Sequence, residues 1–215
     1  MGLAVRTGAW AKSGSHTPTA YGGLRFTAES VNSSVQLTAV GSAPAVTLIK
    51  SFDGVNWEDY TVGEVIELPS IGDFVYLAAG EGGNETFASS SSIYNRFVIN
   101  GLVAASGDIT SLRNFDLVQT TLATSCYLGM FRGCTGLTSA PELPATTLAG
   151  SCYRNMFYGC TKLSLIKVHF TAWGTQTSAW VSNVPSTGTF YKPSALPDEF
   201  SADRIPTGWT VVNID

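Results

Sequence analysis

The carboxylates are the residues that could most readily do chemistry, since two of them facing each other would support acid–base or glycosidic reactions. A glycosidase needs such a pair about 5–10 Å apart in a cleft. In the first half of this chain the acidic residues are scattered among sequences typical of turns, and none lies in a recognisable catalytic motif. Eight of them are the candidates considered for such a pair: Asp53, Glu58, Asp59, Glu64, Glu67, Asp73, Glu81 and Glu85. A glycan-processing enzyme therefore ranks third among the possible functions, after a virion protein and a bacterial surface adhesin.

The two histidines and four cysteines are the other side chains that could take part in catalysis or bind a metal. A Ser–His–Asp arrangement would have to use His16 or His169, and the chain has no P-loop, GxSxG or HExxH sequence. Neither histidine stands at a ligand spacing from a cysteine pair. We therefore expect no enzyme activity, no cofactor and no metal. The cysteines are expected to be buried free thiols, with a bridge between neighbouring repeats as the alternative: Cys126, Cys134, Cys152 and Cys160.

All four cysteines lie in a tandem repeat of 26 residues. The segment from Leu117 (LVQTTLATSCYLGMFRGCTGLTSAPE) and the segment from Leu143 (LPATTLAGSCYRNMFYGCTKLSLIKV) share 14 identities. A degenerate third copy lies around Thr175–Val184, where Trp180 takes the place of Met156 at a spacing of 24. A fixed period of about 20–30 residues is typical of a leucine-rich solenoid, in which each coil is covered by its neighbour.

Each repeat is expected to hold a short helix, between Leu148 and Gly159 in the second copy, followed by a strand over Leu163–Val168. At about 100° per residue, the side chains that the two copies share fall on one half of this helix. They are predicted to be buried, and include Cys152, Tyr153, Met156, Phe157 and Cys160. The copies differ on the outward half. Three outward residues are the candidate contact residues of the solenoid: Arg132, Arg154 and Tyr158.

The region before the repeats is expected to be all-β. Short alternations of apolar and polar residues, with turn signals about every 8–12 residues, indicate an Ig-like β-sandwich over residues 23–105. A leucine-rich-repeat solenoid with a C-terminal cap is expected over 106–215. The expected fold class is thus mainly β with α/β repeats, and late aromatic residues should cover the last coil: Trp180, Phe190, Tyr191 and Trp209.

The repeat resembles a known family. The string LPATTLAGSCYRNMFYGCTKL looks like the BspA-like leucine-rich repeats of surface proteins from gut Bacteroidales, which also occur in structural proteins of their phages. VSNVPSTGTFYK and IPTGWTVVNID resemble the closing cap of that family, and SFDGVNWEDYTVGEVIELPSIGDFVYLAAG resembles its preceding β domain. The likeness covers about residues 23–215 and implies a fibre, decoration or adhesion protein. It departs from the family in having only two full repeats.

The leader, Met1–Gly22, is rich in Gly, Ser and Thr and has no sustained period. It lacks the apolar run of about 7–15 residues of a secretory signal. We expect an extended arm that anchors the protein on other virion proteins through Trp10 and Tyr21, with a disordered tail as the alternative. A surface-type architecture without an export signal favours a virion component over a bacterial cell-surface adhesin.

The composition of the chain limits the classes of partner that it can bind. Charged residues make up 13% of the chain and the net charge is −4, which argues against nucleic acid because phosphate binding needs clustered Lys and Arg. No apolar run approaches the ~20 residues that span a bilayer. We expect a non-enzymatic virion protein, homo-oligomeric on the particle, that contacts a host surface protein or glycan.

Overall fold

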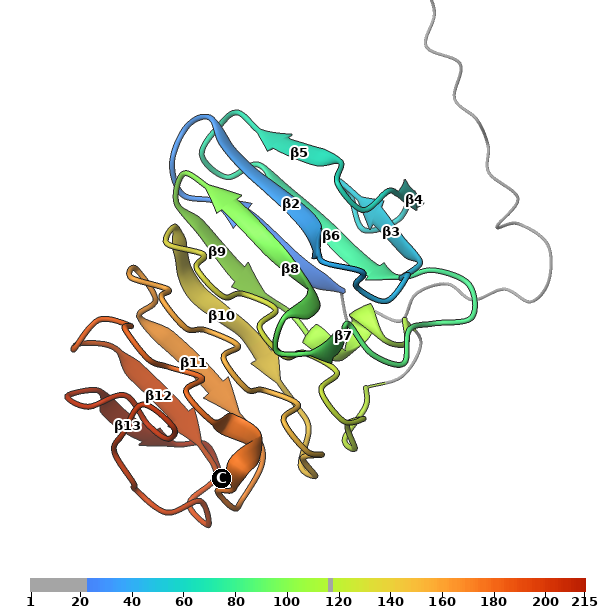
Figure 1. Ribbon diagram of the computed structural model, residues 1–215. Helices are drawn as coiled ribbons and strands as arrows, with labels where there is room; N and C mark the ends of the chain where they lie inside the picture. The colour runs from blue at the N-terminus through green and yellow to red at the C-terminus, as the bar shows by residue number, and fades with distance from the viewer. Residues whose placement is uncertain (1–22, 116–117) are drawn as a thin grey trace, which may run out of the picture.

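The computed structural model describes residues 23–115 and 118–215, which form two β-layers facing each other (Figure 1). The large layer is one nine-stranded sheet and the small layer is a four-stranded sheet. In order across the large sheet, the strands are β13 (Thr210–Asn213), β12 (Thr189–Lys192), β11 (Leu165–Val168), β10 (Leu137–Leu143), β9 (Val103–Ser106), β1 (Leu24–Ala28), β6 (Phe74–Ala79), β3 (Leu48–Ser51) and β4 (Glu58–Tyr60).

The small sheet covers the N-terminal half of the large one. Its strands are β5 (Val65–Leu68), β2 (Ser33–Val40), β8 (Ile93–Asn100) and β7 (Ala88–Ser90), all antiparallel to their neighbours. Alternating residues of β1, β2 and β8 point into the space between the sheets, where Phe26, Leu37 and Phe97 are fully buried. The period of two that the sequence shows in these segments is thus the pattern of two facing β-layers.

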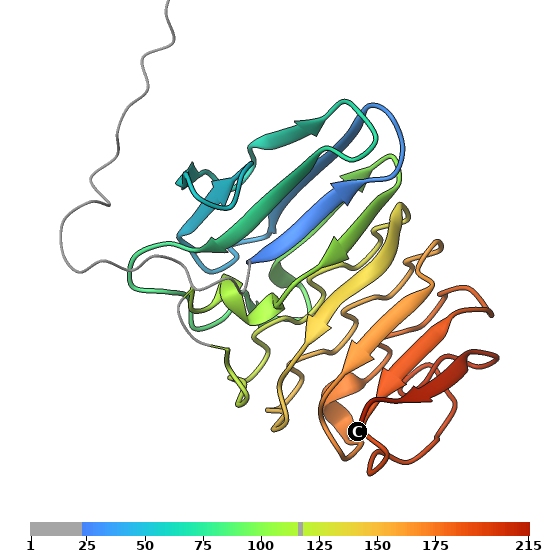
Figure 2. The ribbon, with the colours of Figure 1, turned by 180° about the vertical axis from the view of Figure 1, so that it is seen from behind.

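Strand β9 is the joint between the two halves of the chain. It pairs antiparallel with β1 on one side and parallel with β10 on the other. From β10 to β13 all pairs are parallel. Figure 2 shows, from behind, how these yellow to red strands continue the sheet of the N-terminal half. The C-terminal half is a β-solenoid of about three turns that shares one sheet and one core with the rest.

The prediction of a helix in each repeat is wrong. Residues Leu148–Gly159 form a chain of tight turns instead, and the described residues contain no α-helix. The only helical elements among them are two short 3-10 helices, Ile109–Leu112 and Thr175–Thr177. Every fourth residue of the turn chain has a positive φ, in the left-handed region: Ser125, Gly129 and Gly133 in the first coil, and Ser151, Asn155 and Gly159 in the second. An α-helix cannot continue through such residues.

We call this chain of turns the turn ladder, over residues 123–134, 149–160 and 175–184. Its amide groups alternate between two partners. In the first coil, the N–H of Leu128 donates to the carbonyl of Ser125 in the same turn, whereas the N–H of Gly129 donates to Arg154 in the next coil. Five such bonds of 2.7–3.1 Å join the first two coils. Every second backbone group therefore pairs as in a sheet, although the chain is not extended.

The turn ladder continues the small sheet in the same way that β10–β13 continue the large one. The N–H of Phe97 in β8 donates to Met130 at 2.7 Å, and the N–H of Phe87 donates to Cys126 at 3.0 Å. Bonds of the same kind link the second coil to the third, as from Phe157 to Trp180 at 2.8 Å. The spacing of 24 predicted between Met156 and Trp180 is confirmed by this register.

Two rows of stacked aromatic rings run through the core from the N-terminal half into the solenoid. One row comprises Phe97, Phe131 and Phe157, with ring centroids 5.2 and 5.6 Å apart. The other comprises Phe87, Tyr127, Tyr153 and Trp180, with centroids 6.1–6.4 Å apart and planes within 24° of parallel. All of these side chains are fully buried, as are Met130 and Met156. The burial predicted from the repeat is confirmed, although the predicted helix is wrong.

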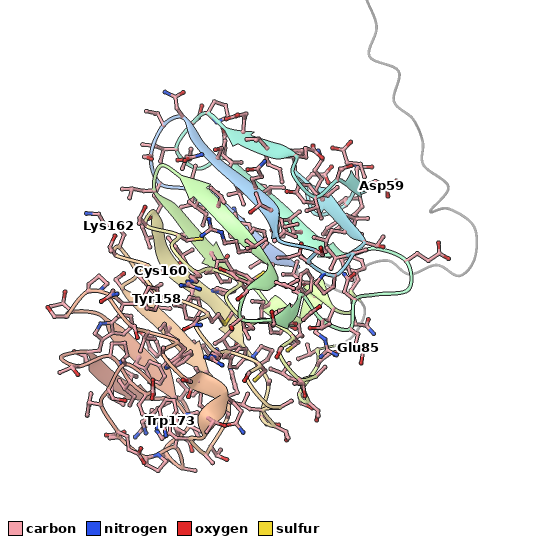
Figure 3. The ribbon with its side chains drawn as sticks, viewed as in Figure 1. Asp59, Glu85, Tyr158, Cys160, Lys162 and Trp173 are labelled. Atoms are coloured by element: carbon pink, nitrogen blue, oxygen red, sulfur yellow. The ribbon has the colours of Figure 1, made fainter. Side chains whose placement is uncertain are left out.

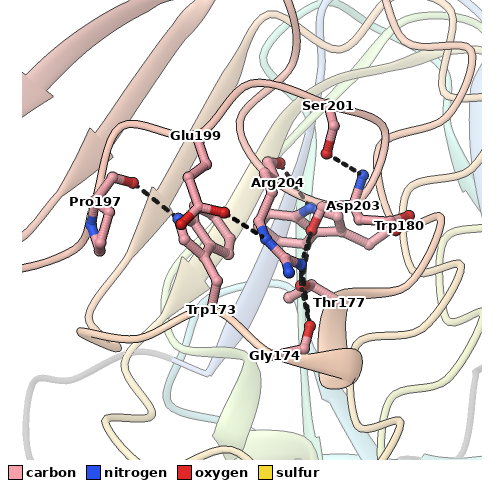
Figure 4. A network of polar contacts seen from close by, with 9 residues as sticks. All are labelled: Trp173, Gly174, Thr177, Trp180, Pro197, Glu199, Ser201, Asp203 and Arg204. Carbon is pink, nitrogen blue, oxygen red and sulfur yellow. Dashed lines mark hydrogen bonds and ion pairs between the residues drawn. The ribbon is translucent and has the colours of Figure 1, made fainter.

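The C-terminal loop closes the last coil through a polar network around Arg204 (Figure 4). The Arg204 guanidinium donates to the Gly174 carbonyl at 3.0 Å and pairs with Glu199 at 3.2 Å, and the indole N–H of Trp180 donates to the Arg204 carbonyl at 2.8 Å. Trp180, Phe190 and Trp209 are buried, as a cap requires. The prediction that Tyr191 also covers the last coil is wrong, because its side chain points outward from β12.

None of the helices in the described ranges is long and apolar enough to cross a bilayer.

Candidate functional site

The three contact residues predicted in the solenoid lie on the outward side of the turn ladder. Arg154 and Tyr158 are four residues apart in the second coil, and Arg132 occupies in the first coil the place that Tyr158 occupies in the second. Lys162 follows where this coil turns toward β11, and is exposed. We call the outward side chains of Arg132, Arg154, Tyr158 and Lys162 the ladder face. Figure 3 labels Tyr158 and Lys162 on it, at the side of the molecule away from Asp59 and Glu85.

Arg132 and Tyr158 contact each other across neighbouring coils. The Arg132 guanidinium carbon lies 5.3 Å from the centre of the Tyr158 ring, in a cation–π arrangement. On the other side, the Nη1 atom of Arg96 in β8 donates to the Arg132 carbonyl at 3.0 Å, and the Arg96 Nε atom is buried without a hydrogen-bond partner. A row of two guanidinium groups and one aromatic ring therefore runs from the small sheet onto the solenoid.

The cations of the ladder face are unpaired. Within the described ranges, neither Arg132, Arg154 nor Lys162 forms an ion pair with a carboxylate. The sequence explains this, because Glu142 is the single acidic residue between Val118 and Pro197. Glu142 lies on β10, in the opposite layer. The ladder face thus carries positive charge in a protein whose net charge is −4.

The outer face of β10 and β11, which we call the strand face, holds its charges differently. Glu142 pairs with Lys167 at 2.7 Å and with the Nε2 atom of His169 at 2.8 Å. Partial burial raises the pKa of Glu142, but the hydrogen bonds and charges of Lys167 and His169 outweigh it, so that the pKa lies below its ordinary value. Burial raises the pKa of the neighbouring Asp108, whose carboxylate accepts from Thr110. His169, a possible triad member by sequence, is here a partner of Glu142.

The structure accounts for the difference between the copies at one ladder position. Leu128 stands in the first coil where Arg154 stands in the second. Leu128 is buried against Ala88 of β7 and Tyr94 of β8. The same position in the second coil has no strand over it, and Arg154 is exposed there. An apolar residue is therefore required in the first coil, and a charged one is tolerated in the second.

The cysteines are free and buried, as predicted. The thiol of Cys134 donates to the Phe97 carbonyl and that of Cys160 donates to the Phe131 carbonyl, both at 3.1 Å. Burial raises the pKa of Cys126, Cys152 and Cys160 to about 12. Thiols that stay protonated in a packed interior are structural groups and poor nucleophiles.

The other candidate positions in the described part of the chain are not gathered into a second cluster. The carboxylates of the N-terminal half lie at turns and edges; Glu58 and Glu64 both pair with Lys50, and Glu67 and Asp73 line a hollow beside Phe52 and Phe74. The described residues contain no group of three His, Cys, Asp or Glu that could hold a metal ion. Trp10, Tyr21 and His16 lie outside the described residues.

Sequence reasoning missed Lys162 as a member of the ladder face and Arg96 as its neighbour in the small sheet. Lys162 belongs to the repeat but follows the segment that was expected to be helical. Arg96 lies 36 residues before Arg132, and only the pairing of β8 with the first coil brings the two together. The signal that could have found the surface is the absence of Asp and Glu from Leu143 to Pro197.

Comparisons with protein-family models, with curated proteins and with solved structures gave no match.

Proposed function

We propose that this protein is a non-enzymatic structural component of a phage particle, of the fibre or decoration type. In this proposal the chain is a BspA-like leucine-rich-repeat protein with an Ig-like sandwich in its N-terminal half. Its leader, Met1–Gly22, anchors it on other virion proteins, and the ladder face touches the surface of the host cell or its glycans. Several copies act together on one particle, so that weak single contacts sum to firm attachment.

The observation that carries the proposal is the ladder face itself. Three exposed or half-exposed cations and one aromatic ring stand there without a carboxylate partner, on a backbone whose coils are joined by regular hydrogen bonds. A rigid base of this kind presents side chains at fixed spacing and loses little entropy on binding. Within the described part of the chain, the scattered carboxylates and His169, which contacts Glu142, supply no comparable arrangement for catalysis.

Anchoring can be tested with the full-length protein. The double variant Trp10→Ala/Tyr21→Ala should fold normally and yet be lost from phage particles purified by density gradient, whereas Tyr158→Ala should still be incorporated. Incorporation of the double variant at full occupancy would contradict an anchor at these residues.

The alternative, a bacterial surface adhesin, uses the same ladder face from a different location. Antibody labelling of intact bacterial cells, compared with labelling of released particles, separates the two. Signal on cells alone would replace the virion proposal with the adhesin.

A further inference from the structure

We propose that the ligand of the ladder face is an acidic polysaccharide, one that carries uronate carboxylates or sulfate groups on its sugar rings. This inference rests on the proposed contact role of the ladder face and names the chemical class of its ligand. Arg132, Arg154 and Lys162 would pair with the acidic groups, and the Tyr158 ring would lie against the apolar face of one sugar.

The charges favour an anionic ligand. Elsewhere in the described ranges, four cations pair with a carboxylate of the chain itself: Lys50, Lys167, Lys192 and Arg204. The other three have no carboxylate partner but are held within the fold, Arg25 over the Phe74 ring and Arg96 and Arg113 by donating to backbone carbonyls. The ladder cations have no such partner, and the nearest acidic residue in sequence, Glu142, lies in the opposite layer. Two of them are arginines, whose planar guanidinium groups bind carboxylate and sulfate oxygens through paired hydrogen bonds.

The shape of the ladder face favours a chain lying flat. Gly133 and Gly159 are neighbours in successive coils, with positive φ of 76° and 74°. A Cβ atom on Gly159 would stand 3.7 Å from the Gly133 Cα atom, so the two residues form a strip without side chains beside Arg132 and Tyr158. The surface is therefore low next to the Tyr158 ring, because no side chain rises from these two glycines. A low, flat floor suits an extended ligand better than a bulky side chain of a protein partner.

Several other side chains of the turn ladder are of types that can form hydrogen bonds with sugar hydroxyl groups. Ser151, Asn155, Ser182 and Asn183 are half-buried or exposed along the second and third coils, and their hydroxyl and amide groups can donate and accept. Tyrosine adds a ring with an apolar face and a polar tip. Nucleic acid would demand a denser cationic track than three cations spread over two coils. The mixture on the ladder face thus matches an acidic sugar polymer.

The test is direct binding of purified full-length protein to soluble polysaccharides. Polygalacturonate supplies carboxylates, chondroitin sulfate supplies carboxylates and sulfates, and dextran supplies the same kind of polymer without charge. We expect binding to at least one acidic polymer and none to dextran, with affinity falling as salt is raised from about 50 to 500 mM because the contacts are exposed charges.

Variants locate the contact. Arg132→Gln, Arg154→Gln and Lys162→Gln combined should weaken binding by about tenfold or more. Tyr158→Leu, which removes the ring and keeps the charge, should weaken it by a smaller factor. Lys167→Gln is the matched control, since it removes one cation from the strand face, and it should change the affinity by less than about twofold. All of these side chains are at least partly exposed, and thermal unfolding would verify that each variant is folded.

Three results would overturn the inference: no binding to either acidic polymer, equal binding to dextran, or full binding by the triple variant. Binding of duplex DNA as tight as that of the acidic polymers would overturn it as well, by showing unselective attraction of polyanions. If the protein is incorporated into particles and adheres to host cells but ignores acidic polysaccharides, this inference fails and the proposed function stands. If it binds them yet is absent from particles, the reverse holds.

Discussion

The ladder face and the strand face lie on opposite layers of one solenoid, and they differ in whether their cations have a carboxylate partner. On the strand face, Glu142 contacts Lys167 at 2.7 Å and the Nε2 atom of His169 at 2.8 Å. On the ladder face, Arg132, Arg154 and Lys162 have no acidic partner in the described ranges. Both surfaces are built from the same repeating coils, so the difference comes from where the sequence places its carboxylates.

The two layers also differ in how the backbone is held. Extended strands in parallel register form the strand layer, whereas the ladder layer needs a left-handed residue at every fourth position. Gly, Ser and Asn occupy these positions in the first two coils. The strand layer therefore accepts most residue types, whereas the ladder layer requires residues that tolerate a positive φ at every fourth position.

A charge in the core between the two layers should have the largest effect. Met156 is fully buried between the layers. Met156→Asp would place an unpaired carboxylate there and should lower the free energy of unfolding by about 4 kcal/mol or more. Met156→Leu, which keeps the volume, should cost less than about 1.5 kcal/mol. Urea unfolding of both variants checks this, and a mild effect of the aspartate would show that the two layers are not packed on a common core.

A change of backbone preference in the ladder layer should have an intermediate effect. Asn155 has a φ of 56°, and Gly129 holds the equivalent place in the first coil. Asn155→Val puts a β-branched side chain in the left-handed region and should cost about 1–2 kcal/mol. Asn155→Gly should stay within about 1 kcal/mol of the wild type. Equal stability of the valine and glycine variants in chemical denaturation would argue against the left-handed turn.

Removal of the strand-face carboxylate should have the smallest effect. The pKa of Glu142 is lowered in the folded protein, so its contribution is present above the unfolded value of 4.5 and is lost as the pH falls through the folded value. Glu142→Gln should cost at most about 1 kcal/mol at pH 7, and the difference from wild type should shrink toward pH 3. A difference that grows on acidification would show that the ion pairs do not stabilise the fold.

The helix prediction failed for a reason that the turn ladder makes clear. A turn chain with a four-residue period and a helix with 3.6 residues per turn bury nearly the same positions over a dozen residues, so Cys152, Met156 and Cys160 are inward in both. Burial was therefore predictable while the backbone was not. What distinguishes the two is the run Ser151, Asn155, Gly159, since residues that accept positive φ recur at the same interval.

Strand β10 follows from the repeat, because it is the counterpart in the first copy of the strand predicted over Leu163–Val168, and it contains Pro141. The two strands pair parallel with a register shift between Ser139 and Glu142, which accommodates the proline. The outward residues Arg132, Arg154 and Tyr158 could be named from the repeat. Their lack of carboxylate partners required the structure, because it depends on Glu142 facing the other side.

Lys162 and Lys167 allow the most direct test, since each lies on one of the two faces of the same coil. The full-length protein would be acetylated briefly with and without saturating polygalacturonate, and the modification of each lysine would be measured by peptide mass spectrometry. The ladder-face account predicts that Lys162 becomes protected while Lys167 is modified at an unchanged rate. Equal modification of Lys162 in both samples, or protection centred on Lys167, would contradict it.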